Sequence, residues 1–199
     1  MSKSDPASSK SEKSKAARWV ITIFFVTILV SSVISLASEE LMSGSHIAVA
    51  FLILLAIILL GIIFDIVGVA VTSADEKPFH SMAARKVPGS QEAILLLRNA
   101  DKVGSICNDV IGDICGVVSG SASATIAAQI LSSGIFNMSW PRLISLVMSA
   151  FVAALTVAGK ALGKNVAINS CTKIVHCVGR IIYRFRHITD IFRKEKTNS

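Results

Sequence analysis

Residues 47–73 read IAVAFLILLAIILLGIIFDIVGVAVTS, a stretch in which Asp65 is the one charged side chain. A membrane helix needs about 20 mainly apolar residues to cross a hydrocarbon core of roughly 30 Å. The stretch is long enough, and its part from 47 to 64 carries no charge at all. The sequence therefore predicts a membrane-spanning helix here, with the bilayer as its main solvent.

The composition of the whole chain agrees with a membrane environment. Of its 199 residues, 52% are hydrophobic and 17% are charged, which is more apolar material than one soluble core of this size needs. This excess argues against secreted disulfide scaffolds, disordered chains and soluble nucleic-acid binders. With two Trp and one Tyr, the chain also lacks the aromatic girdles of a membrane β-barrel.

Three further stretches have the length and composition of membrane spans, at residues 19–38, about 103–131 and about 143–163. The first follows a basic leader, as a signal peptide does. Its apolar run is too long for a typical signal peptide, however, and Ser35-Leu36-Ala37 is a poor cleavage site, so we expect a retained helix. The prediction is an all-α polytopic bundle with about four transmembrane helices.

The basic residues orient this predicted bundle. The leader is basic, whereas the first connection, at residues 39–46, holds two acids and no Lys or Arg. The connection 75–102 and the C-terminal tail are basic as well, so the positive-inside rule predicts that both termini are cytoplasmic, with Arg142 as the exception. We expect no nucleic-acid partner, because the basic residues flank spans and are not interleaved with stacking aromatics.

Segments outside the spans have their own character. Residues 1–17, rich in Ser and Lys, predict a disordered basic arm. Pro78 and Pro88 divide residues 74–102 into pieces that predict juxtamembrane helices. Basic and apolar residues alternate through 165–199 as in an amphipathic helix. Such a tail would bind membrane lipids of an anionic leaflet or pack on the juxtamembrane helices, and both alternatives stay open.

Charged side chains within spans are rare, because inserting one at the centre of a membrane helix costs at least about 2.5 kcal/mol. Four occur here, and the helical rise places them all in the inner part of the membrane; they are Asp65, Asp109, Asp113 and Lys160. Asp109 and Asp113 are i and i+4 and so share one helix face, and Asn108 adds a neutral oxygen beside them.

These residues allow two interpretations. Oxygen ligands that face a bundle interior suit a hard cation such as Mg²⁺ or Na⁺. In that case Asp65, Asn108, Asp109 and Asp113 are the candidate ligands and Lys160 is a charge-compensating group. Alternatively, Lys160 forms an ion pair with one aspartate and locks the helices together. The spacing does not decide between the two.

Small residues concentrate in the third span between 116 and 128. They predict close packing against other helices of the chain, with a homodimer seam as the sharper alternative.

The sequence contains no candidate for catalysis. Cys107, Cys115, Cys171 and Cys177 lack the spacing of a zinc or redox site, so we expect reduced thiols. There is no nucleophile elbow, phosphate loop or metalloprotease helix, and an enzyme is not expected.

Three phrases, taken in order, resemble a known membrane domain. Residues 64–73 read FDIVGVAVTS, residues 93–102 read AILLLRNADK, and residues 105–108 read SICN. They resemble FSGAETALTS, LLxNPDx and IGN in the transmembrane domain of the cyclin M and CorB/CorC family. The resemblance implies such a domain over residues 46–164, with an extra helix at 18–38 before it and without the family's cytoplasmic nucleotide-sensing domains.

Members of this family are associated with Mg²⁺ transport or efflux, often coupled to Na⁺, and typically form dimers. The resemblance therefore implies a homodimeric protein that binds or transports a cation. Asn108, Gly159 and Lys164 match family positions. Asp65 stands where the family has serine, and Gly68 and Lys160 stand where it has glutamates.

The loss of both glutamates leaves two readings of the site. The ammonium of Lys160 takes the place of the bound ion in a non-transporting scaffold or regulatory subunit, whose basic tail recruits lipid or a protein partner. In the other interpretation, the carboxylates of the two family glutamates are replaced by carboxylates at other positions, those of Asp65, Asp109 and Asp113. Lys160 then points to water.

Overall fold

The computed structural model describes the backbone of residues 6–42, 45–132 and 141–197, and side chains between residues 18 and 187 of these ranges except 141–142. Within them the chain is helical with short connections and no strand, which confirms the predicted all-α class. The elements are α1 (Pro6–Met42), α2 (Ile47–Ser73), α3 (Lys77–Ala84), α4 (Ser90–Arg98), α5 (Ala100–Gly104), the π-helix η1 (Ser105–Ile111), α6 (Gly112–Ser132), α7 (Pro141–Asn169) and α8 (Cys171–Thr197).

Four helical stretches are long and apolar enough to cross a membrane, as expected for an integral membrane protein: Arg18–Met42, Ile47–Ser73, Ala100–Ser132 and Leu143–Asn169. The fourth is longer than predicted, so the expected boundary at residue 164 falls inside α7 and the amphipathic helix begins at Cys171. Lys164 does not end the helix, because a long lysine stem can follow apolar surface while its ammonium reaches water.

Helix α1 begins inside the predicted N-terminal arm. From Pro6 onward its backbone is helical, while residues 1–5 lie outside the described part of the chain, and the disorder expected for the arm stays a prediction. Extending an existing helix requires no new nucleus, and proline is tolerated in a first turn because its missing N–H has no helical acceptor there.

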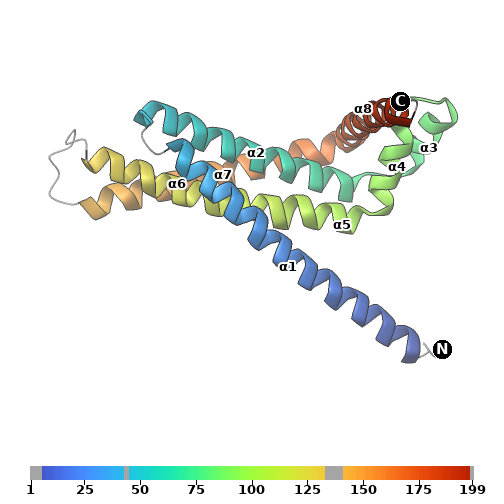
Figure 1. Cartoon of the computed structure of the whole chain (residues 1–199), viewed down its shortest axis with the longest axis horizontal. Coiled ribbons are helices and arrows are strands. Elements are labelled where there is room, and N and C mark those ends of the chain that lie inside the picture. Colours follow the sequence, from blue (N-terminus) through green and yellow to red (C-terminus); the bar gives the residue numbers. More distant parts are fainter. Residues whose placement is uncertain (1–5, 43–44, 133–140, 198–199) are drawn as a thin grey trace.

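The core consists of α2, α6 and α7, which lie side by side along the long axis of the molecule (Figure 1). Glycines bring these helices close together. On α7, Gly159 and Gly163 lie against Ile62 and Ile66 of α2, and a Cβ placed on Gly163 would be 2.7 Å from Ile66 Cγ1. A Cβ on Gly61 of α2 would be 2.8 Å from that of Cys115 on α6. Small residues four apart allow such an approach between membrane helices.

The predicted packing role of the small residues in the third span is confirmed for one face of α6. This face is buried in the bundle and includes Ser119, Ala122, Ser123 and Ala127. The N-terminal end of α1 projects away from the bundle, and the helix then covers another side of α6 (Figure 1). Where it approaches the bundle, the ring of Trp19 lies 5.6 Å from Lys102 Nζ of α5.

Helices α3, α4 and the first half of α8 form a layer at one end of the core (Figure 1). Phe79, Ala93 and Val175 are fully buried in it. The backbones of Gly89 and Gly179 touch, since a Cβ on Gly89 would be 2.5 Å from the backbone nitrogen of Arg180. Packing on the juxtamembrane helices, one of the two predicted roles of the tail, is thus confirmed for the beginning of α8.

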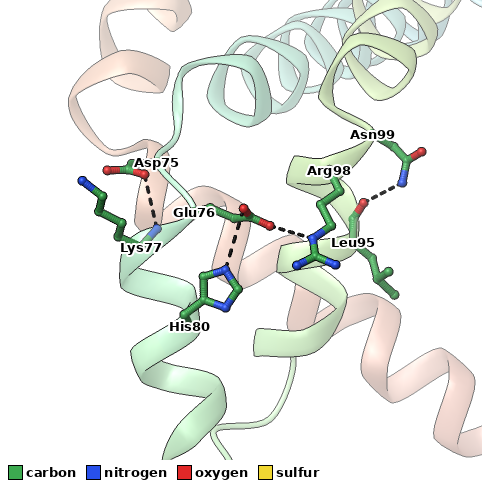
Figure 2. A network of polar contacts seen from close by, with 7 residues as sticks. All are labelled: Asp75, Glu76, Lys77, His80, Leu95, Arg98 and Asn99. Carbon is green, nitrogen blue, oxygen red and sulfur yellow. Dashed lines mark hydrogen bonds and ion pairs between the residues drawn. The ribbon is translucent and has the colours of Figure 1, made fainter.

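A polar network on the surface of this layer joins α3 to α4 (Figure 2). Arg98 Nε donates to Glu76 Oε1 at 2.9 Å, and His80 Nε2 lies 3.7 Å from the other carboxylate oxygen. The hydrogen bond from Arg98, and then its charge, lower the pKa of Glu76 below the usual value of 4.5. This exposed ion pair links the start of α3 to the end of α4 and adds a small contribution to their packing.

We predict that Gly179→Ala loosens α8 from α4. The added Cβ would meet the carbonyl oxygen of Gly89, which is backbone and cannot move aside, and such overpacking costs about 1–3 kcal/mol. The free energy of unfolding in mixed micelles measures the loss. Gly116→Ala is the control, because a Cβ there has no neighbour within 4 Å and alanine is the better helix former. Equal stability of both variants would contradict this packing.

Candidate functional site

The third span contains an irregular turn. Its residues Ser105–Ile111 form the π-helix η1, between α5 and α6. Such turns are rare and often occur at functional sites, because they break the regular pairing of backbone groups and rotate side chains. Asn108 and Asp109, two of the predicted ligands, lie on this turn.

Asn108 points from this turn into the core. Its amide group fills the space beside Gly68 of α2, where a Cβ would overlap Asn108 Oδ1 and lie 2.7 Å from Cγ. The glycine therefore makes the room that Asn108 occupies.

The oxygen of this amide is buried and has no hydrogen-bond partner. A buried acceptor left unpaired costs about 1–3 kcal/mol, so buried polar atoms in proteins are nearly always paired. Elsewhere in the described residues, Gln129 Oε1 and His176 Nε2 share this property, but both lie outside the predicted site. Asn108 Oδ1 is thus a buried acceptor without a partner between α2 and the third span.

Lys160 approaches the same region from α7. Its Nζ lies 3.4 Å from the position that a Cβ would take on Gly112, at the start of α6. The preceding residue, Gly159, packs directly on α2 and so determines where Lys160 leaves the helix. The structure shows no ion pair within 4.0 Å between Lys160 and any described carboxylate, so the pair considered from the sequence is not formed.

Asp65 shares the face of α2 that meets the third span. Gly61, Asp65 and Gly68 follow an i, i+4, i+7 spacing, which keeps them on one helix face. Gly61 lies opposite Cys115 and Gly68 opposite Asn108, so the half-buried Asp65 lies at a level between these two contacts. On the third span, Gly112 also lies between Asn108 and Cys115, so Asp65 and Gly112 lie at a similar depth in the bundle. The Lys160 ammonium, which lies beside Gly112, is at that depth too.

Asp109 and Asp113 are exposed on the outer side of the bundle. They share a face, as predicted, but it is not the face that carries Asn108. The four predicted ligands are thus not brought together, and the described residues contain no group of three or more His, Cys, Asp or Glu that could hold a metal ion. Sequence spacing relates residues of one helix to each other, whereas the rotation of that helix depends on its packing.

Sequence reasoning missed Gly112, the residue beside which the Lys160 ammonium lies. A signal was present, because glycine follows Asn108 by four residues and recurs at positions 61 and 68.

Comparison of the chain with protein-family models, curated proteins and solved structures finds no match. The arrangement of Asp65, Asn108 and Lys160 is therefore the feature of the chain that bears most directly on its function.

We predict that Asn108→Leu does not destabilise the protein in ion-free detergent. Leucine has the same number of side-chain heavy atoms and the same branching but no unpaired acceptor, so stability should be unchanged or higher by up to about 3 kcal/mol. The free energy of unfolding checks this. The same change at exposed Asn99, whose Nδ2 donates to Leu95 O at 2.9 Å, should bring no gain. A clear loss of stability in Asn108→Leu would mean that the amide has a protein partner.

Proposed function

We propose that this protein is an integral membrane protein that binds a hard cation, Mg²⁺ or Na⁺, inside its helix bundle and moves it across the membrane. The main support for this proposal is the buried, unpaired Oδ1 of Asn108 between α2 and the third span. Amide and carboxylate oxygens are the ligands that such cations prefer. Asp65, half-buried at a neighbouring level of α2, supplies the carboxylate, and the family resemblance supports the same function.

In this proposal Lys160 controls occupancy. Two unit charges 4 Å apart repel by about 4 kcal/mol at the effective dielectric constant of a protein surface. A cation beside Asn108 therefore requires the ammonium to move away from Gly112. The four-carbon stem of lysine allows this movement, because it can extend along the helix toward the headgroups. The cation would then enter as the Lys160 ammonium withdraws, so that one positive charge replaces the other.

A second candidate function rests on the same lysine. Its ammonium already lies against α6 inside the bundle. If it remains there, it is a permanent substitute for the ion, and the protein is a non-transporting scaffold or regulatory subunit. The two candidates differ in one measurable property, the response of the folded protein to added cations.

We expect Mg²⁺ or Na⁺ to stabilise the wild-type protein in a saturable way. A ligand that binds only the folded state contributes about 2.7 kcal/mol at about 100 times its Kd. Thermal unfolding in detergent across Mg²⁺, Na⁺ and Ca²⁺ titrations measures this. The response should vanish in Asn108→Leu and shift to lower concentration in Lys160→Met, where the competing charge is gone.

Asp109→Asn is the matched control for this titration, because it removes an acid that the structure places on the outer face. It should keep the response of the wild type. If no cation stabilises any of these proteins and Lys160→Met unfolds more easily than the wild type, the scaffold function is the correct one.

We further propose a homodimer that buries the outer face of α6. A Cβ on Gly116 or Gly120 would have no neighbour within 4 Å, and the exposed Asp109 and Asp113 continue the same face toward the inner end. Carboxylates are costly against lipid, and small residues favour close helix pairs. A second copy of the chain would cover both the carboxylates and the glycines of this face.

Oxidative cross-linking in native membranes tests the dimer. With the four native cysteines replaced, Gly120→Cys should give a disulfide-linked dimer. Leu146→Cys should not, although Leu146 of α7 is itself 68% exposed. Equal cross-linking at both positions would indicate random collision and would contradict the proposed seam.

The sidedness of the bundle stays a prediction. The described part of α1 begins at the end of the molecule where α3, α4 and α8 lie (Figure 1), as an even number of spans requires. The positive-inside rule makes this the cytoplasmic end.

A further inference from the structure

Helix α8 begins where a membrane span ends. Ser170 is the single residue between α7, whose apolar stretch runs to Asn169, and Cys171 at the start of α8. In Figure 1 the core helices run across the picture, whereas α8 is seen nearly end-on. It therefore turns across the end of the bundle and does not continue along the direction of α7.

One face of α8 is held by the protein itself. Val175 and Gly179 are buried, and one turn further Tyr183 lines a small cavity of about 200 Å³ together with the connection between α3 and α4. These positions are four residues apart and so define a single docked face. This docking determines which sides of the helix point outward.

The next face of α8 is apolar. Ile174, Val178, Ile181 and Phe185 follow an i, i+4, i+7, i+11 spacing, which defines one stripe. The first two are half-buried, but the side chains of Ile181 and Phe185 are 50% and 68% exposed. Among the described side chains, the apolar stripe thus extends past the protein layer and is solvent-accessible at Ile181 and Phe185.

Beside the apolar stripe runs a basic one. Lys173, Arg180 and Arg184 follow an i, i+7, i+11 spacing and all are exposed. Residues 171–187 contain no Asp or Glu, so no acid on this part of α8 neutralises them. An anionic surface therefore complements this stripe.

We propose that α8 binds anionic phospholipids of the membrane that the chain spans. Ile181 and Phe185 insert below the headgroups, while Lys173, Arg180 and Arg184 contact the phosphates. An apolar stripe adjoining a basic one on a helix parallel to the surface matches the change from acyl chain to headgroup. Basic residues at an anionic leaflet add attraction. This site is separate from Asn108 and does not depend on the proposed ion binding.

The binding would attach the α3–α4 layer to the leaflet. Helix α4 packs on α8, and α3 packs on α4. Lipid contact at Arg180 and Arg184 would therefore hold all three helices at the leaflet. The anchorage of that layer would then depend on the anionic lipid content of the leaflet.

Fluorescence of the full chain in nanodiscs tests the proposal. Trp19→Phe and Trp140→Phe remove the native tryptophans, and Ile181→Trp places a reporter on the apolar stripe. The discs contain phosphatidylcholine alone or an equimolar mixture with phosphatidylglycerol, each with and without brominated acyl chains. We expect the emission to shift to shorter wavelength and quenching by bromine to increase in the anionic discs.

Two paired variants give the controls. Arg180→Gln with Arg184→Gln should return the reporter to its behaviour in neutral discs, and high salt should weaken the effect. Lys77→Gln with Arg85→Gln removes the same charge from exposed positions of the same layer and should change nothing. Thermal unfolding verifies that each variant is folded.

Three outcomes would overturn the proposal. Emission typical of water in both discs means that the stripe does not meet the membrane. Equal quenching in neutral and anionic discs means insertion without recognition of anionic lipid. A blue shift without quenching by bromine means that the stripe is covered by protein.

Discussion

The close approach of α2 to both of its neighbours is made at glycines, because no larger residue would let the helix axes come so near. Gly61 and Gly68 meet the third span, while Gly159 and Gly163 of α7 meet α2 from the other side. In a bilayer, association between helices draws on this kind of packing, since lipid tails are as apolar as the side chains that they would replace. The contacts determine the rotation of each helix, and with it the direction of every polar side chain.

The character of the candidate site follows from these rotations. With Gly68 against η1, Asn108 is turned inward, and its oxygen is left without a partner. The same rotation turns Asp109 outward. On α7, the packing of Gly159 brings the neighbouring Lys160 beside Gly112. A neutral oxygen, a half-buried carboxylate and an ammonium therefore lie near one another where α2, the third span and α7 meet.

The juxtamembrane layer is built on a different principle. It is held by a buried cluster around Phe79, Ala93 and Val175, by the backbone contact of Gly89 with Gly179, and by the ion pair of Glu76 with Arg98. Water reaches its outer surface, so charged residues are tolerated there at little cost. This layer sets α8 across the end of the bundle, with Val175 and Gly179 docked and with Arg180, Ile181 and Arg184 exposed.

The all-helical class, the four apolar stretches and the amphipathic tail could be predicted from the sequence, since length, hydropathy and helical periodicity are local properties. The same local patterns identified Asp65, Asn108 and Lys160 as the unusual polar residues of the spans. Helix bounds were harder to predict, since α1 begins at Pro6, inside the predicted arm, and α7 continues past residue 164 to Asn169. Periodicity relates residues within one helix, whereas the direction of a face depends on contacts between helices distant in the chain. The folded chain was therefore needed to show that Asn108 faces α2, that Asp109 and Asp113 face outward and that Lys160 lies without a carboxylate beside it.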